Sequence, residues 1–129
     1  MMEKEPQQRI SFVSHKGRRV LLLDFSGIAK ADDALAVIAY ARSFVARQPQ
    51  ASLFTLTDIS DSDYNRKVTD ALMELGKHNK PYVIAGGAVG VTGLSKIVFK
   101  SILAFSGRTN IQLFESREAA LDWLAAYAD

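Results

Sequence analysis

The sequence predicts a single-domain α/β protein whose mostly parallel sheet of about five strands begins with an N-terminal antiparallel hairpin. Its 129 residues fit one domain. Short apolar runs alternate with segments in which apolar residues recur at helical spacing. Residues 82–96 pass from an apolar run through four glycines into an amphipathic helix. Strands that alternate with helices in this way imply parallel neighbours joined by right-handed crossovers.

The first part of the chain predicts the hairpin. Residues 1–8 are polar and are expected to form a flexible N-terminus, which leaves 9–129 as the domain. Strands are expected at 9–14 and 19–25, joined by a turn that contains Gly17. The apolar run 20–23 lacks alternation, so the second strand should be covered on both faces.

The middle of the chain predicts a helix, a strand and a second helix. Asp32 or Asp33 can cap the first helix, which should end near residue 47, before Pro49. A strand at 52–59 precedes a helix at 62–78, which Pro81 follows. The expected core-facing residues are Ala34, Val37, Ile38, Ala41 and Val45 in the first helix, and Tyr64, Val68, Ala71, Leu72 and Leu75 in the second.

The last part completes the order ββαβαβαβα. The glycine segment leads into a helix at 93–105, and a short strand at 111–114 precedes a final helix capped by Ser116. In the 93–105 helix, the geometry of 100° per residue predicts Leu94, Ile97, Val98, Ser101 and Phe105 inside and Lys96, Phe99, Lys100 and Leu103 outside. In the final helix, the predicted inward residues are Ala120, Trp123, Leu124 and Tyr127.

Composition excludes several classes of function. The absence of cysteine removes disulfides, thiolate nucleophiles and cysteine metal sites. Sixteen basic against fourteen acidic residues give no nucleic-acid footprint. The charged first residues lack the apolar core of a signal peptide, and no apolar run approaches the roughly 20 residues that span a bilayer. We therefore expect a cytoplasmic protein.

No pattern predicts catalysis, a cofactor or a metal. The glycine spacings of one, three and three match neither phosphate-loop fingerprint. Asp58, Asp61 and Asp63 lack the glycine and the distal glutamate of a calcium loop, and capping of the following helix explains the last two better. His15 and His78 have no suggested nucleophile partner. A non-enzymatic protein is the expectation.

Several strings resemble the SpoIIAA-like family, also described as STAS/SEC14-like. They are LLDFSG at 22–27, LTD at 56–58, GAVGVTGL at 87–94, FSGR at 105–108 and EAALDWL at 118–124. The resemblance implies helices mainly on one face of the sheet and a small regulatory or binding module. In the anti-anti-sigma branch, a serine in an Asp-Ser-Ser-Gly string is phosphorylated by a partner kinase. Residues 58–64 keep Ser60 and Ser62 there but lack the glycine.

The loop before the 93–105 helix is a candidate site for an anion or a headgroup. Backbone N–H groups at the start of a helix, with nearby hydroxyl and ammonium groups, favour negative charge. The candidate residues are Gly90, Thr92, Gly93, Ser95 and Lys96. The alternative is that the glycines allow close packing and Thr92 only caps the helix.

A second candidate surface lies on the helix itself. Phe99 and Leu103, between Lys96 and Lys100, are expected to face outward and, with Met73, to line an apolar groove with a basic rim. Such a groove suits an amphiphile with an anionic head. The alternative is that neighbouring helices cover the two apolar side chains.

These observations predict a module that engages a partner protein or a small amphiphilic ligand through the helices at 62–78 and 93–105. One alternative is a SEC14-like lipid carrier or a peripheral membrane protein. Another is an antagonist of an anti-sigma factor, phosphorylated on Ser60 or Ser62. An uncovered apolar face of the sheet would favour a homodimer.

Overall fold

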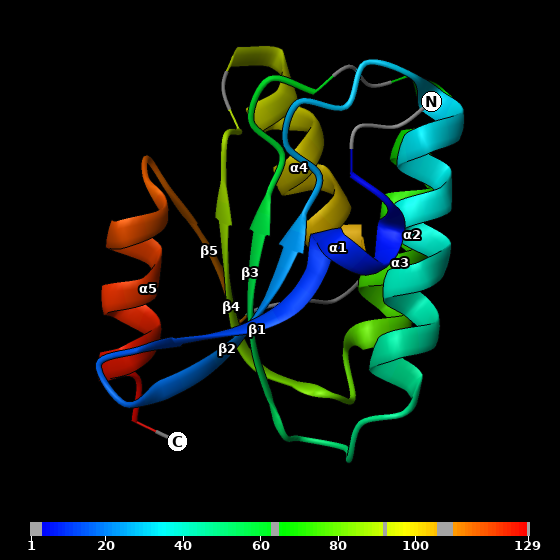
Figure 1. Ribbon diagram of the computed structural model, residues 1–129. Coiled ribbons are helices and arrows are strands. Elements are labelled where there is room, and N and C mark those ends of the chain that lie inside the picture. The colour runs from blue at the N-terminus through cyan, green and yellow to red at the C-terminus, as the bar shows by residue number, and fades with distance from the viewer. Residues whose placement is uncertain (1–3, 63–64, 92, 106–109, 129) are drawn as a thin grey trace.

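The computed structural model describes residues 4–62, 65–91, 93–105 and 110–128. A five-stranded sheet with the order β1-β2-β3-β4-β5 lies between two layers of helices (Figure 1). The strands are β1 (Ile10–His15), β2 (Arg18–Asp24), β3 (Leu53–Asp58), β4 (Val83–Val89) and β5 (Ile111–Phe114). The helices are α1 (Pro6–Arg9), α2 (Ala31–Ala46), α3 (Arg66–Asn79), α4 (Gly93–Phe105) and α5 (Arg117–Ala126).

The predicted fold class is confirmed. β1 and β2 are antiparallel, and every later neighbour is parallel. The helices α1 to α4 lie on one side of the sheet and α5 lies on the other (Figure 1). The one-turn helix α1 has no counterpart among the predicted elements.

Two predicted caps are wrong. The N-cap of α2 is Lys30, so Asp32 and Asp33 lie in the first turn, where they interact with the helix dipole instead. α3 begins at Arg66, because the side chain of Asn65 accepts a hydrogen bond from the N–H of Val68 at 2.9 Å. Asp61 therefore lies in the loop before α3, whereas Asp58 ends β3 and Asp63 lies outside the described residues.

The hairpin turn has the geometry that its residues predict. Lys16 and Gly17 both have positive φ values, 49° and 81°, and they join His15 to Arg18 in register. A two-residue turn of this type matches the right-handed twist of the two strands. The turn therefore fixes the pairing register of β1 and β2.

The sheet separates two apolar clusters. The larger one packs α2 and α3 against one face, and its buried members include Leu21, Leu23, Val37 and Leu75. The smaller one packs α5 on the opposite face and contains Val20, Phe54, Leu56, Ala85, Val89, Ala120 and Leu124. β2 contributes to both clusters, as its unbroken apolar run predicts. α5 covers the sheet face away from α2 and α3, so the structure gives no support to a homodimer formed through an uncovered apolar face.

Two glycines of β4 allow the close packing that the sequence suggested. A Cβ at Gly86 would lie 2.6 Å from both Ile111 Cδ1 and Thr55 Oγ1. A Cβ at Gly87 would lie 3.1 Å from the Cβ of Ala120 in α5. Side chains at these positions would push apart the strands on one face and the helix on the other.

The buried face of α4 differs from the prediction, although Lys96 and Lys100 are exposed as expected. Ile97, expected inside, is 64% exposed, and Ser101 is exposed as well. Phe99 packs against the larger cluster, and Leu103 is half-buried. Apolar residues occur on both sides of this helix, so their periodicity alone does not choose the buried face. The side chains of Leu94, Val98 and Phe105, also expected inside, lie outside the described residues.

Candidate functional site

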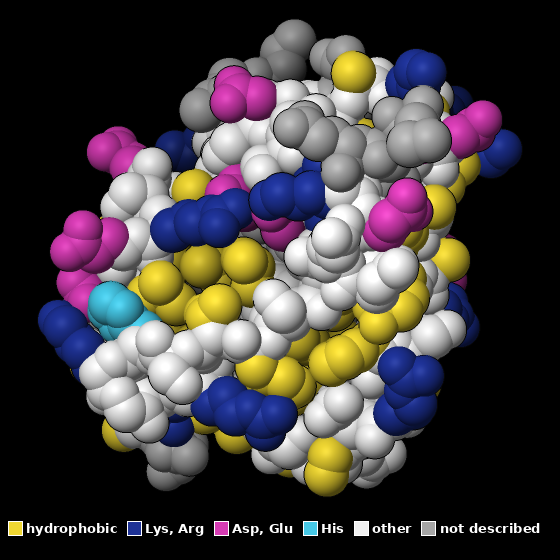
Figure 2. All heavy atoms as spheres, in the orientation of Figure 1, with side chains coloured by type: hydrophobic (Ala, Val, Ile, Leu, Met, Phe, Trp, Pro, Cys, Tyr) yellow, Lys and Arg dark blue, Asp and Glu magenta, His cyan; other side chains and the backbone are white. Residues whose placement is uncertain are grey.

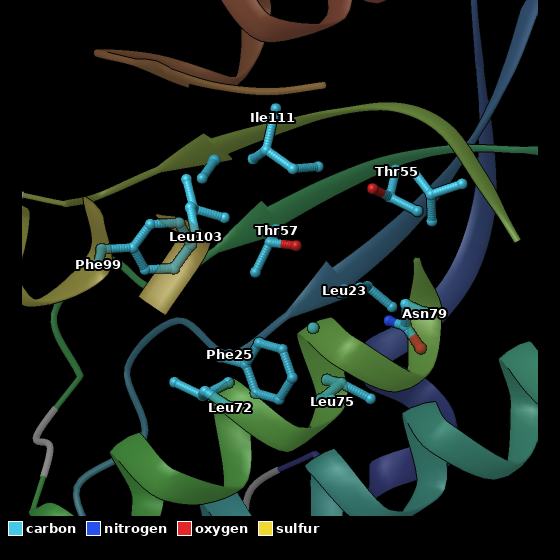
Figure 3. A pocket seen from close by; sticks show the side chains of 14 residues that line it. Leu23, Phe25, Thr55, Thr57, Leu72, Leu75, Asn79, Phe99, Leu103 and Ile111 are labelled. Atoms are coloured by element: carbon cyan, nitrogen blue, oxygen red, sulfur yellow. The ribbon is translucent and has the colours of Figure 1, made fainter. Parts of the chain in front are cut away.

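A small cavity lies between the sheet and the helices α3 and α4 (Figure 3). Its volume is about 60 Å³. Phe99 and Leu103 of α4 and Leu72 and Leu75 of α3 form one wall. The opposite wall is the sheet, which contributes Leu23, Phe25, Thr55, Thr57, Gly87, Ala88 and Ile111.

The cavity is mainly apolar, with few polar groups at its edge. Thr55, Thr57 and Asn79 supply the hydroxyl and amide groups (Figure 3). This volume is enough for a few water molecules. An acyl chain fits only if α4 moves away from the sheet. Met73 is half-buried and does not line this cavity.

The exposed part of α4 carries two lysines and one large apolar residue. Lys96, Ile97 and Lys100 are all exposed. Ile97 is the one large apolar side chain that is strongly exposed among the described residues. The two lysines are therefore exposed as predicted, but the large exposed apolar residue beside them is Ile97 and not Phe99 or Leu103.

The structure tests the loop before α4 only in part. Gly90 has a φ of +88°, and a Cβ there would lie 2.4 Å from both the backbone nitrogen and the Oγ of Ser60. Gly90 therefore lets the loop after β4 approach the loop after β3. Gly93 is the first residue of α4. Thr92 and the side chain of Ser95 lie outside the described residues.

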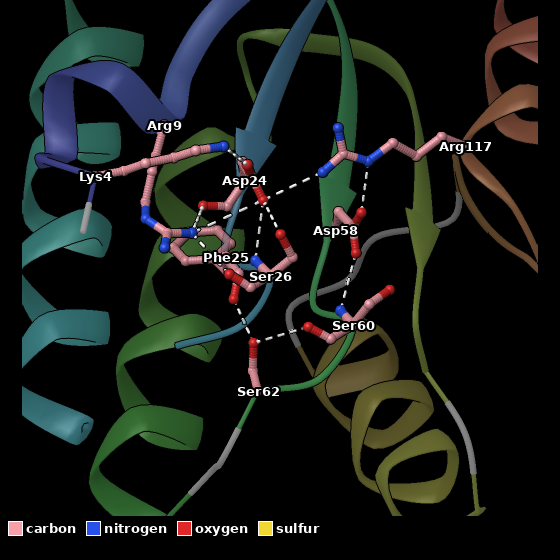
Figure 4. A network of polar contacts seen from close by, with 9 residues as sticks. All are labelled: Lys4, Arg9, Asp24, Phe25, Ser26, Asp58, Ser60, Ser62 and Arg117. Carbon is pink, nitrogen blue, oxygen red and sulfur yellow. Dashed lines mark hydrogen bonds and ion pairs between the residues drawn. The ribbon is translucent and has the colours of Figure 1, made fainter. Parts of the chain in front are cut away.

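A polar network lies at the carboxyl ends of β2 and β3 (Figure 4). Asp24 and Asp58 end these parallel neighbours, and each residue is only 5% exposed. Arg117, in the first turn of α5, donates from Nε to Asp58 Oδ2 at 2.5 Å and from Nη2 to Asp24 Oδ1 at 3.2 Å. One guanidinium therefore bridges two buried carboxylates from the opposite side of the sheet.

Asp24 has further partners. The backbone N–H and the hydroxyl of Ser26 donate to its Oδ1 at 3.0 and 2.5 Å. Lys4 lies 3.7 Å from Oδ2, and Arg9 lies 3.9 Å from Oδ1. Burial alone would raise the pKa of Asp24, but the hydrogen bonds from Ser26 and the charges of Arg117 and Arg9 outweigh it and lower the pKa.

Arg9 holds the loop that follows β2. It is 7% exposed, and its Nη1 donates to the carbonyl oxygens of Asp24 and Ser26 at 3.1 and 2.8 Å. Its Nε is buried and is the one such side-chain atom without a partner in the part of the chain that the structure describes. The short helix α1 thus places a cation against the end of β2.

The loop that carries the two candidate serines is anchored on both sides. Backbone bonds continue beyond the strand ends, from Phe25 N to Asp58 O, from Gly27 N to Ser60 O and from Ile59 N to Val89 O. The hydroxyl of Ser62 donates to the carbonyl oxygen of Phe25. The N–H of Ser60 donates to Asp58 Oδ1 at 2.8 Å, whereas its hydroxyl faces Gly90. Asp58 therefore links Ser60 to Arg117.

The sequence analysis missed this network. Its signal was present, since Asp24 follows the run Leu21–Leu23 and Asp58 follows Leu-Thr in the next strand. The carboxyl ends of neighbouring parallel strands meet at one edge of a sheet, where loop side chains gather. Arg117 gave no signal, because nothing local relates it to residues 59 and 93 positions away.

The other features singled out in the sequence have structural roles. His15 Nε2 lies 2.6 Å from Asp122 Oδ1, which joins the hairpin to α5. His78 stacks on Tyr82 and bonds to Asn79 through Nδ1. Among the residues described, no three His, Asp or Glu side chains come together as metal ligands. Within the same residues, every helix is too short or too polar to cross a bilayer.

The fold has known relatives in structure. Models of known protein families give no match, and neither do curated protein sequences. A similar solved structure is that of an uncharacterised protein from the DUF3478 family of Shewanella loihica, described as having a SpoIIAA-like fold. It is 19% identical, has a TM-score of 0.67 and aligns over 89% of this chain and 91% of its own.

A second similar structure is an anti-sigma-factor antagonist (STAS) domain protein from Planctomyces limnophilus. It is 11% identical, has a TM-score of 0.61 and aligns over 91% of this chain and 98% of its own. Both alignments span about nine-tenths or more of each chain. The resemblance found in the sequence is thus confirmed at the level of architecture: the chain has a SpoIIAA-like fold of the kind found in STAS domains.

Proposed function

We propose that the protein is a non-enzymatic, cytoplasmic binding module that takes up a small amphiphile between the sheet and the helices α3 and α4. The observation that carries the proposal is the apolar cavity beneath Phe99 and Leu103. Lys96 and Lys100 lie exposed on the outer face of the same helix. An apolar chain would enter beneath α4, and its anionic head would stay near the lysines.

The floor of the cavity supports this proposal. Thr55 and Thr57 of β3 and Ala88 of β4 line it, and all three side chains are small. Small side chains leave space that opens when α4 moves outward, whereas leucines at these positions would fill it. Outward movement costs the contacts of Phe99 and Leu103, which the apolar chain of the ligand would replace.

Binding of palmitate tests the proposal directly. The readouts are native mass spectrometry of the purified protein and calorimetric titration with palmitate. Ala88→Leu should fill the cavity, and Lys96→Glu with Lys100→Glu should repel the carboxylate. The matched control is Lys30→Glu with Lys67→Glu, which makes the same charge change at two exposed positions, the N-cap of α2 and the first turn of α3.

We expect the wild type and the control to bind palmitate, and both site variants to lose at least tenfold in affinity. Circular dichroism and thermal unfolding establish that each variant is folded. Equal affinity in all four proteins would place the ligand elsewhere, and no binding to the wild type would contradict the proposal. Phe99→Asp is unsuited to this test, because Phe99 packs against the larger cluster.

A partner protein or a membrane surface is the second candidate, and the exposure of Ile97 favours it. An isoleucine between two lysines suits contact with an anionic lipid interface or an acidic protein surface. Ile97→Asp should abolish sedimentation with phosphatidylglycerol vesicles if the surface binds membranes, and leave palmitate binding intact. A stable complex in pull-down that Ile97→Asp disrupts, without vesicle binding, would indicate a protein partner.

Phosphorylation of the β3–α3 loop is the third candidate, by analogy with anti-sigma-factor antagonists. Ser60 is the better acceptor, because the hydroxyl of Ser62 already donates to Phe25. Intact-mass and peptide analysis of protein isolated from its native host should show a single phosphate that Ser60→Ala removes. A phosphate retained in that variant would assign the modification to another residue.

A further inference from the structure

The strand β1 is an unprotected edge of the sheet. Among the described residues it pairs with β2 alone, and its residues 10–14 contain no charged residue and no proline. The pairing with β2 runs without a bulge over all six residues. Sheet proteins usually protect such an edge with a charge, a proline, a bulge or a covering element. In Figure 1 this strand lies at the front of the molecule, with no helix across it.

The free hydrogen-bonding groups of β1 follow from the turn. In a two-residue hairpin, the residues that flank the turn form a hydrogen-bonded pair, here His15 with Arg18. Pairs alternate along an antiparallel ladder, so Ser11 and Val13 also bond to β2. The N–H and C=O groups of Phe12 and Ser14 therefore point away from the sheet, toward the free edge.

Apolar side chains flank this edge on both faces of the sheet (Figure 2). On the α2 side, the partly buried Phe12, Phe44 and Tyr40 form a chain of ring contacts, with centroids 5.8 and 6.3 Å apart. On the α5 side, Val13 and Leu22 are partly buried against the smaller cluster. A strand added along β1 would cover both patches.

We propose that β1 pairs antiparallel with β1 of a second copy of this chain, which joins the two sheets across a two-fold axis at Val13. In this register the outward N–H and C=O groups of Phe12 in each copy form hydrogen bonds with those of Ser14 in the other copy. Val13 faces Val13 of the second copy in a close pair without hydrogen bonds, an arrangement that suits β-branched side chains.

The residues at the two ends of β1 favour this register and favour a second copy of the chain as the partner. α1 ends at Arg9 and the turn begins at Lys16. A pairing centred on Val13 sets Lys16 opposite Ile10 of the second copy, so each turn stops short of the other copy's α1. No charged residue of β1 then faces another, which removes the like-charge repulsion that usually opposes self-pairing. The two-fold axis also places each apolar patch beside the equivalent patch of the second copy.

Sedimentation-velocity ultracentrifugation from about 1 to 200 μM tests the proposal. The wild type should form a dimer in this range. Ser14→Pro removes an outward N–H and leaves the ladder to β2 intact, and Ser14→Lys adds an edge charge. Both should shift the dissociation constant at least tenfold toward monomer. Ser101→Lys, the same change at an exposed position of α4, is the control.

Hydrogen exchange reports on the edge itself. The amides of Phe12 and Ser14 should be protected only at concentrations that populate the dimer, whereas the amide of Val13 should be protected at all concentrations. A wild type that stays monomeric overturns the proposal. So does a dimer whose affinity is unchanged by Ser14→Lys, since Ser14→Pro alone could act by unfolding the hairpin. None of these outcomes depends on ligand binding beneath α4.

Discussion

Arg117 Nε lies 2.5 Å from Oδ2 of Asp58, although the two residues are 59 positions apart in the sequence. Arg117 is the first residue of α5, and Asp58 is the last residue of β3. A cation in the first turn of a helix opposes the helix dipole. An arginine is nevertheless favourable at the start of α5, because its guanidinium contacts the two buried carboxylates. The contact joins the lone helix on one face of the sheet to the loops that lead to α2 and α3 on the other face.

Replacing Arg117 should destabilise the fold. Arg117→Ala leaves Asp24 and Asp58 buried with fewer partners, and a buried charge without its partner is costly. The side chain of Arg117 is 41% exposed, which reduces the effect to about 2 kcal/mol in the free energy of unfolding. Urea denaturation measures it. Arg42→Ala, at an exposed position of α2, is the control and should change the midpoint little; equal losses would count against the network.

The ionisation of Asp24 should make the stability of the fold depend on pH in the acid range. Its pKa is lowered in the folded state, so its carboxylate stabilises the fold above the unfolded value of about 3.9, and the stabilisation is lost as the pH falls through the folded pKa. Urea midpoints between pH 7 and pH 2 should fall less steeply for Asp24→Asn than for the wild type. Asp122→Asn removes a carboxylate whose lowered pKa is due to His15 and Lys16 at a more exposed position, and should flatten the curve less.

A methyl group at Gly90 should be more harmful than one at Gly27. Both glycines have positive φ, 88° and 68°, so each alanine substitution costs about 1 kcal/mol of backbone strain. Only at Gly90 would the new Cβ also meet Ser60, at 2.4 Å, whereas nothing lies within 4 Å of a Cβ at Gly27. Thermal unfolding of the two variants should separate them by several degrees. Equal melting temperatures would show that the loops relax without cost.

The orientation of α4 can be checked by three truncations. Phe99→Ala and Leu103→Ala remove side chains that face the cavity and should each destabilise the fold by about 2 kcal/mol, the low end for a core site, since both are only half-buried. Ile97→Ala removes an exposed side chain and should change stability by less than about 0.5 kcal/mol. The reverse order would restore the orientation expected from helical periodicity.

The sequence was a good guide wherever one physical signal dominated. Lys16-Gly17 predicted the hairpin, and the glycines of β4 predicted close packing that Ile111 and Ala120 confirm. The unbroken apolar run in β2 predicted burial on both faces. In each case, a local property of one or two residues determines the structure.

The errors arose where two signals were nearly equal or where contacts are distant. α4 is apolar on both sides, so only the position of α3 decides that Phe99 faces inward and Ile97 outward. The N-cap of α3 is Asn65 and not one of the serines or aspartates that precede it in the sequence. The side of the sheet on which α5 packs depends on a long-range crossover, and the pairing of Arg117 with Asp58 follows from it.

The position of α5 also has a consequence for the order of folding. The hairpin and the units up to β4 can collapse around the larger cluster while the other face of the sheet still exposes Val20, Leu56 and Ala85. That face is closed only after α5 has been synthesised. We therefore expect a nascent chain that ends before α5 to be prone to aggregation and to require protection by chaperones. Packing of α5 should remove this tendency by covering the exposed apolar face.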